Sequence, residues 1–234
     1  MGTDIHGGMF RRYRGDKNWR FMSEVPRNRN YALFAALAGV RNGHGFAGVE
    51  TFEPLVPIAE DRGLPSPFLV CVGTNAKGED VNVEIAGDGS LLPGARRTID
   101  FDFGDHSMTH MTLEELIEWP GWDKELSDSG FLSRQEYDHW QERLRADPKA
   151  TPKSYSGGVW GQNVVKTTQA EILAGTAPNN WTDVQCRWNS PMRDECPTFL
   201  KWLDWLRIES HYDLYKERNE PNYTEYMLVI GFDS

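Results

Sequence analysis

The pattern of apolar and polar positions predicts strands at both ends of the chain and a buried helix close to the first of them. Residues 4–14 alternate weakly between polar and apolar side chains, and residues 19–23 can pair with them as the second arm of a hairpin. Residues 31–38 are apolar nearly all round, with an asparagine placed to cap the helix and a glycine just past its end. Residues 223–232 form an apolar run, so we expect this strand at the centre of a sheet, next to the first strand.

The middle of the chain adds shorter elements of both kinds. Capping boxes at Thr112, Ser133 and Thr168 each predict the start of a helix. The other expected elements are an antiparallel meander of residues 68–72, 81–85 and 98–103, a loop at 147–161, a strand at 181–188 and an amphipathic helix at 197–209. These elements predict an α+β fold, a mainly antiparallel sheet with the first and last strands central, flanked by helices. We expect one domain over residues 1–234, with a β-hairpin insertion at about 66–103.

Composition and charge narrow the classes of partner. The chain has 234 residues, 39% of them hydrophobic, and its formal net charge of −10 opposes binding to bulk nucleic acid or to anionic membranes. Its three cysteines are scattered and no apolar run is long enough to span a bilayer, so we expect a reducing compartment, the cytoplasm. Two kinds of partner stay open: a small anionic ligand in a local basic pocket, and a DNA-binding host protein that the acidic surface would occupy as a DNA mimic.

The first strand carries a candidate catalytic pair. Asp4 and His6 are two residues apart, so on a strand both side chains leave the same face, while Ile5 points toward the core. An acid beside an imidazole can bind a metal, orient its neighbour or transfer a proton. If the first and last strands pair, Asp233 should lie close to both side chains. The alternative is a hydrogen-bonded polar pair at a chain end.

A second cluster follows the third strand of the predicted meander. Asp105 and His106 should lie at a turn from strand to helix, with His110 close by. Carboxylate and imidazole ligands together suit Mn, Zn or Fe better than Ca. We therefore expect a divalent metal (Mn, Mg or Zn) held by Asp4, His6, Asp105 and His106, with Asp4, His6 and His106 as the catalytic residues. The alternative is that the histidines only cap the helix.

A glycine-rich loop directly after the buried helix is the candidate ligand-binding segment. Glycines allow backbone N–H groups to approach an anion, and Arg41 beside them can form a fork to phosphate. Residues 43–48 fit GxGxxG, but a helix precedes them and prolines follow, so we do not expect a dinucleotide-binding turn. The expected ligand-binding residues are Arg41, Asn42, Gly43, His44, Arg29 and Trp160. The alternative is a tight structural loop with Arg41 in a surface ion pair.

The opening Met1-Gly2-Thr3-Asp4-Ile5-His6 resembles that of a family of uncharacterised phage-borne and bacterial proteins, whose members begin with Met-Gly-x-Asp-Ile-His. Residues 29–43 are similar to the family's segment after its first hairpin, and the ending at Phe232-Asp233 is similar to the family's close. The family carries no activity that transfers to this chain. The resemblance implies a setting, a phage-encoded protein in a bacterial cytoplasm, where accessory proteins often block host defence.

Asp4-x-His6, with the later Gly104-Asp105-His106, is also similar to the D-x-H opening of calcineurin-like metallophosphoesterases. The later Gly-Asn-His and Gly-His-x-His signatures of that family are missing, so the resemblance implies only a divalent ion that activates water against a phosphoester. We expect a phage accessory protein that hydrolyses a small phosphate-bearing ligand, such as a nucleotide signal, while residues 154–161 close over it. Two alternatives stay open: a protein that sequesters the nucleotide without cleaving it, and an acidic DNA mimic that inhibits a host protein.

Overall fold

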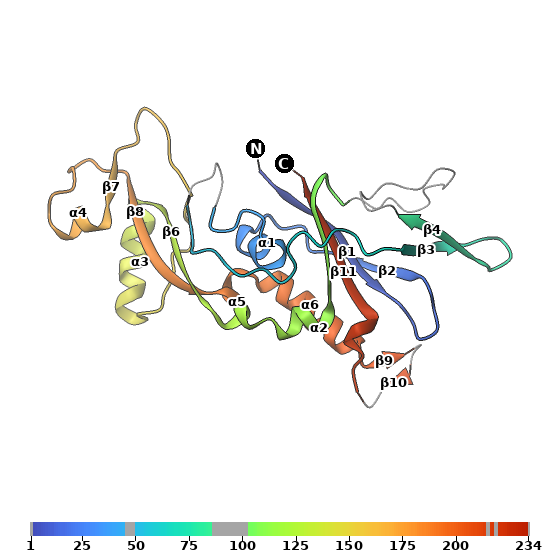
Figure 1. Cartoon of the computed structure of the whole chain (residues 1–234). Coiled ribbons are helices and arrows are strands. Elements are labelled where there is room, and N and C mark those ends of the chain that lie inside the picture. The colour runs from blue at the N-terminus through green and yellow to red at the C-terminus, as the bar shows by residue number, and fades with distance from the viewer. Residues whose placement is uncertain (1, 45–49, 86–102, 214–215, 218–219, 234) are drawn as a thin grey trace.

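The computed structural model describes residues 2–44, 50–85, 103–213, 216–217 and 220–233 of an elongated molecule built on two main sheets, with β9 and β10 as a separate two-stranded ribbon (Figure 1). The larger sheet has six strands in the order β4-β3-β2-β1-β11-β5, and the smaller sheet has three in the order β6-β8-β7. The strands are β1 Asp4–Arg11, β2 Trp19–Glu24, β3 Phe68–Thr74, β4 Asp80–Ile85, β5 His106–Thr112, β6 Glu125–Ser133, β7 Lys166–Thr168, β8 Asp183–Pro191, β9 Tyr212–Asp213, β10 Lys216–Glu217 and β11 Tyr226–Asp233. The helices are α1 Tyr31–Ala38, α2 Leu113–Glu118, α3 Arg134–Ala146, α4 Gln169–Leu173, α5 Met192–Glu195 and α6 Pro197–Glu209, with the short 3₁₀ helices η2 Pro120–Asp123 and η3 Tyr223–Glu225.

The two chain ends meet at the centre of the larger sheet, as Figure 1 shows. β1 pairs antiparallel with β11, and Asp4 lies opposite Asp233 in that register. Successive side chains of a strand point to opposite faces, so β11 can bury both faces at once. Leu228 and Ile230 pack in the core that the helices cover, while Met227 packs in an aromatic cluster on the other side. The predicted α+β fold with central first and last strands is therefore confirmed.

Helix α1 lies in the helical core and begins and ends as predicted. The Asn30 side chain accepts a hydrogen bond of 2.9 Å from the backbone N–H of Leu33, which satisfies one of the donors left open at a helix start. Gly39 ends the helix in the left-handed conformation, with φ of 71°, and its N–H bonds to the carbonyl of Ala35. Because every residue from 32 to 38 is buried, the helix fixes the direction in which the following loop leaves the core.

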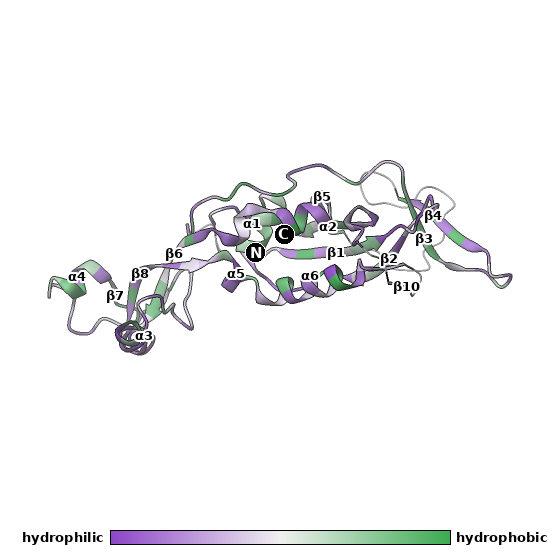
Figure 2. Ribbon diagram, turned by 90° about the horizontal axis from the view of Figure 1, so that it is seen from below, coloured by the Kyte–Doolittle hydropathy of each residue, from purple (hydrophilic) through white to green (hydrophobic). Residues whose placement is uncertain are grey.

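Strands β3 and β4 form the predicted hairpin at one end of the molecule, opposite α3, β7 and α4 (Figure 2). The hairpin joins the sheet through a parallel pairing of β3 with β2, in which Trp19 lies opposite Val70. That pairing is the exception in a sheet whose other pairs are antiparallel within the described residues. Most of the predicted 98–103 strand, with Asp100 and Asp102, lies outside the described residues, and Phe103 is buried in the aromatic cluster. That the hairpin is an insertion, and that the chain is one domain, stay predictions.

Strand β5 corrects one sequence-based expectation. His106 and His110 do not lie at a turn between a strand and a helix; they lie on β5, opposite Phe232 and Val229 of β11. The predicted capping box at Thr112 then opens α2 directly after this strand. Ser107 has a φ of 51°, and the register of β5 against β11 shifts between Ile230 and Phe232. A bulge of this kind interrupts the alternation by which a strand is recognised.

Strand β6 was not predicted at all, and its inward positions explain why. Its buried residues alternate strictly, but they are Leu126, Asp128, Gly130 and Leu132, so a charge and a glycine interrupt the apolar face. β6 pairs with β8 over its whole length, and the far half of this ribbon packs against α3 in a separate core that contains Trp140. No helix in the described part of the chain is long and apolar enough to cross a membrane.

Candidate functional site

The predicted cluster of Asp4, His6 and Asp233 lies where β1 begins and β11 ends. The backbone N–H of Asp4 donates to Asp233 Oδ1 at 3.0 Å. His6 Nε2 lies 3.0 Å from Asp233 Oδ2, and Ile5 on the opposite face is buried in the core. The expectation that Asp233 lies close to Asp4 and His6 is therefore confirmed. Burial alone would raise the pKa of Asp233, but the Asp4 N–H and the His6 imidazole outweigh it and lower that pKa.

Arg29 holds the other carboxylate of this cluster. Its Nε and Nη2 atoms donate to the two oxygens of Asp4 at 2.9 and 2.6 Å, a bidentate pair. The hydrogen bond from Arg29 lowers the pKa of Asp4, and the pKa of Arg29 is raised in turn. Both side chains are about half exposed. This geometry matches the alternative reading of a hydrogen-bonded polar cluster, and the catalytic roles of Asp4 and His6 stay predictions.

The histidine of the second cluster lies on the neighbouring strand. The His106 ring stacks on the Phe232 ring with 6.2 Å between centroids, and His106 Nδ1 lies 3.0 Å from Ser107 Oγ. Asp105 is exposed and donates its backbone N–H to the Phe232 carbonyl at 2.7 Å. Among the described residues, no three His, Cys, Asp or Glu side chains gather closely enough to hold a metal ion. The metal site predicted from Asp4, His6, Asp105 and His106 therefore has no geometric support.

A cavity of about 360 Å³ lies between the C-terminal end of α1 and β5. We call it the α1–β5 cavity; its lining residues are Thr3, Ala38, Gly39, Val40, Arg41, Glu60, Asp61, His106 and Ser107. It brings together two residues that the sequence predicts for a site, Arg41 and His106. Thr3, the residue directly before β1, lines the cavity, whereas Asp4 and His6 do not. The chain-end residues Asp4, His6 and Asp233 do not line this cavity, so they do not share it with His106.

The backbone around the α1–β5 cavity is strained. Arg41, Asp61 and Ser107 have φ of 56°, 47° and 51°, and they are the non-glycine residues with positive φ in the described part of the chain. All three line this one cavity. Such conformations cost about 1–3 kcal/mol each and gather at ligand clamps and active sites. Aspartate tolerates this conformation better than most residues, but Arg41 and Ser107 carry no sequence signal for it.

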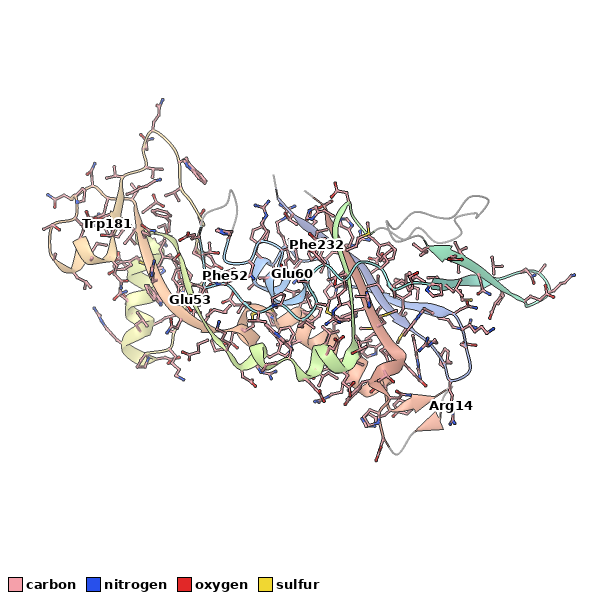
Figure 3. All side chains as sticks on the ribbon, in the orientation of Figure 1. Arg14, Phe52, Glu53, Glu60, Trp181 and Phe232 are labelled. Atoms are coloured by element: carbon pink, nitrogen blue, oxygen red, sulfur yellow. The ribbon has the colours of Figure 1, made fainter. Side chains whose placement is uncertain are left out.

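Contacts to neighbouring elements fix the position of Arg41. Its Nε donates to Thr3 Oγ1 at 3.0 Å, and its guanidinium carbon lies 5.8 Å from the centroid of the Tyr31 ring. Glu60 lies against the end of α1, because a Cβ built on Gly39 would be 3.1 Å from Glu60 Oε1. Figure 3 labels Glu60 beside α1. A carboxylate at a helix C-terminus is electrostatically unfavourable, so the cavity carries an electrostatic cost in addition to the strain.

The remaining predicted ligand-binding residues lie elsewhere. Asn42 makes two hydrogen bonds of 2.7 Å with the backbone of Leu55, one as donor and one as acceptor, which indicates a structural role. Gly43 and His44 line a different hollow, with Arg187. Residues 45–49 of the glycine loop lie outside the described residues. The sequence-predicted set is therefore not a single site.

The predicted 147–161 loop is present, but it does not reach the α1–β5 cavity. Trp160 is 66% exposed. Tyr155 and Gly157 line another cavity, with Arg29 and Asp128. Asp128 is 5% exposed, and burial raises its pKa to about 6, while Ser190 Oγ donates to its Oδ2 at 2.5 Å. The sequence did not indicate Asp128 as a site residue, because an acidic residue within an apolar alternation usually indicates that a strand has ended.

No protein-family model, no curated protein and no solved structure matches this chain.

Proposed function

We propose that the protein is a binding protein for a small ligand with a single phosphate group, such as a cyclic mononucleotide, and that the α1–β5 cavity holds it without cleaving it. The observation that carries the proposal is the convergence of three strained residues on the cavity that contains Arg41. Strained backbone persists only where the surrounding structure enforces it, and it is common at ligand clamps. A volume of about 360 Å³ suits a ligand of mononucleotide size.

The charges around the cavity favour one phosphate over several. Arg41 offers a guanidinium that can bind one anionic group, and His106 adds an imidazole. Glu60 and Asp61 would repel a triphosphate, but their oxygens accept hydrogen bonds from ribose hydroxyl or base amino groups. A cyclic mononucleotide, with one negative charge and several such donors, matches this combination.

Binding without turnover needs only this cavity and its polar groups. Metal-assisted phosphodiester hydrolysis would require a set of metal ligands, and no such set gathers within the described residues. A DNA mimic would require a continuous stripe of exposed carboxylates, and three of the partly exposed ones, Asp4, Asp80 and Glu115, are paired with arginines. The predicted role of a phage accessory protein that intercepts a nucleotide signal would follow from such binding, and it stays a prediction.

Calorimetric titration with 3′,5′-cyclic AMP and with ATP tests the proposal. We expect the cyclic nucleotide to bind more tightly than ATP and to be recovered intact after incubation. Arg41→Gln should weaken binding about 10- to 100-fold, because it removes a charge-assisted pair to phosphate.

Arg193→Gln is the matched control, since Arg193 pairs with Asp123 on the surface away from the cavity. It changes the net charge by the same amount and should leave binding unaltered. Equal affinities of the Arg41 variant and the native protein, or tighter binding of ATP, would reject the proposed site. Release of a linear nucleotide would instead support the hydrolase.

A further inference from the structure

A second cavity of about 360 Å³ lies between the start of α1 and β6, and aromatic side chains and carboxylates surround it. We call it the Asp128 cavity. Its walls come from the start of α1, from the chain around Phe52, from β6 and from the 147–161 loop; Figure 3 labels Phe52 in this region. The residues that carry the argument are Phe52, Asp128, Tyr155 and Glu195. It shares no lining residue with the α1–β5 cavity.

Asp128 is the buried anionic group of this cavity. A carboxylate removed from water is costly unless a positive charge or hydrogen-bond donors compensate it. The described contact is with the Ser190 hydroxyl, and the carboxylate of Glu195 adds a like charge close by. Asp128, Tyr155 and Glu195 all line this one cavity. Their arrangement favours a positively charged occupant.

Tyr31 also lines this cavity. Its Oη is buried and has no hydrogen-bond partner within the described part of the chain. Solvent does not reach this oxygen, so the hydroxyl is an unsatisfied polar group beside the cavity and not a contact for a ligand inside it.

Arg29 also lines the cavity, but its positive charge does not make the cavity positive overall. Its guanidinium is held by both oxygens of Asp4 in the bidentate pair at the chain ends. The carboxylates of Asp128 and Glu195 therefore set the sign of the local charge. The ring faces of Phe52 and Tyr155 can contact a cation and its alkyl chain, because the face of an aromatic ring is electron-rich.

We propose that the Asp128 cavity binds the primary ammonium group of a small organic cation, such as an alkyl diamine. Asp128 accepts a charge-assisted hydrogen bond from the ammonium group, the carboxylate of Glu195 adds attraction, and Phe52 and Tyr155 enclose the alkyl chain. This site is separate from the proposed nucleotide site, so either can exist without the other.

Titration with 1,4-diaminobutane, followed by calorimetry at about pH 7.5, tests the site, with 1,4-butanediol as the neutral ligand of the same length. We expect the diamine to bind and the diol not to bind. Asp128→Asn keeps the shape of the side chain and the Ser190 contact, and it should weaken diamine binding about 10- to 100-fold. Asp123→Asn, at an exposed carboxyl paired with Arg193, changes the net charge equally and should have no effect.

Native protein that fails to bind the diamine, or an Asp128→Asn variant that binds it as tightly as the native protein, would overturn the proposal. Loss of binding in both asparagine variants would also overturn it, because that result indicates diffuse attraction to an acidic surface.

A second variant tests the aromatic wall independently of Asp128. Tyr155 is 49% exposed, so Tyr155→Leu should fold and should weaken binding about two- to fivefold through the lost cation–π contact. Unchanged affinity in this variant would contradict the proposed aromatic wall. N-acetyl-lysine methylamide, titrated in parallel, separates the two sources of a primary ammonium: tighter binding of the diamine supports a free small cation, and tighter binding of the lysine derivative would overturn it in favour of a protein side chain.

Discussion

Asp4 and Asp233 at the paired chain ends and Asp128 on β6 are carboxyl groups of one molecule in opposite surroundings. The first two are about half exposed and bonded to Arg29, to His6 and to a backbone N–H, so their pKa values are lowered. Asp128 is 5% exposed, and burial raises its pKa to about 6. Surface position and charged partners keep the first group ionised at little cost, whereas Asp128 carries its charge in a place where water does not stabilise it.

The residues that stand out in the sequence, here Asp4 and His6, are thus not the residue with the most unusual energetics, which is Asp128. Asp4 and His6 are an obvious candidate pair in the sequence, because both side chains are polar and two residues apart. In the structure, however, both residues interact with Asp233. Asp128 is inconspicuous in sequence, and burial raises its pKa to about 6, so we expect its ionised form to cost stability at neutral pH. Costly groups of this kind persist at functional sites because a ligand or a reaction requires them.

The largest expected effect is therefore on Asp128. Asp128→Asn should stabilise the protein by about 2–3 kcal/mol at pH 7.5, because the difference between a pKa of 3.8 and one of about 6 corresponds to about 3 kcal/mol. A raised folded-state pKa contributes stability below the unfolded value of 3.8, and this contribution is lost as the pH rises through about 6. The gain from Asp128→Asn should therefore shrink below about 1 kcal/mol at pH 4. Urea unfolding at the two pH values measures it.

Asp123→Asn is the control for that series, since Asp123 is exposed. It should change stability little at either pH. A loss of stability in Asp128→Asn at pH 7.5 would mean that the Asp128 carboxylate is compensated inside the fold, and the contrast with Asp4 would disappear.

An intermediate effect is expected at Ser107, where the cost lies in the backbone and not in a charge. Ser107→Gly relieves a φ of 51° that glycine adopts freely, although glycine also raises the entropy of the unfolded chain. Ser127→Gly lies in the regular strand β6, where glycine only weakens the strand. We expect Ser107→Gly to be more stable than Ser127→Gly by about 1 kcal/mol in urea unfolding. The reverse order would show that Ser107 is not strained.

The smallest effect is expected at Asp4. Asp4→Asn removes an exposed bidentate pair with Arg29, and exposed ion pairs contribute little in salt. Tm measured by differential scanning fluorimetry in about 0.15 M salt should fall by less than about 2 °C. A large fall in Tm would show that Asp4 contributes substantially to the stability of the sheet. The contrast between Asp4 and Asp128 would then be weaker.

Local sequence signals predicted the elements whose boundaries are set by caps and by uniform burial. Asn30 and Gly39 mark the two ends of α1, and the Thr112 and Thr168 boxes open α2 and α4. The apolar run of β11 indicated a central strand, and the pairing of β11 with β1 followed from it. These features depend on residues close together in the chain.

Sequence could not predict the features that depend on distant contacts. β6 was missed because Asp128 and Gly130 occupy inward positions, and β5 was taken for a turn because Ser107 interrupts its alternation. The parallel pairing of β2 with β3 has no local signal. Of the candidate site, the sequence indicated Arg41 and His106, but not Glu60, Asp61 or the strain that joins them around one cavity.

The central claim is that the strained α1–β5 cavity holds a single phosphate group through Arg41. A crystal structure of the protein with 3′,5′-cyclic AMP tests it most directly. We predict density for the nucleotide in this cavity, with a phosphate oxygen about 3 Å from the Arg41 guanidinium and the ribose toward Glu60 and Asp61. Density at another surface, or a cavity without nucleotide at saturating concentration, would contradict the account.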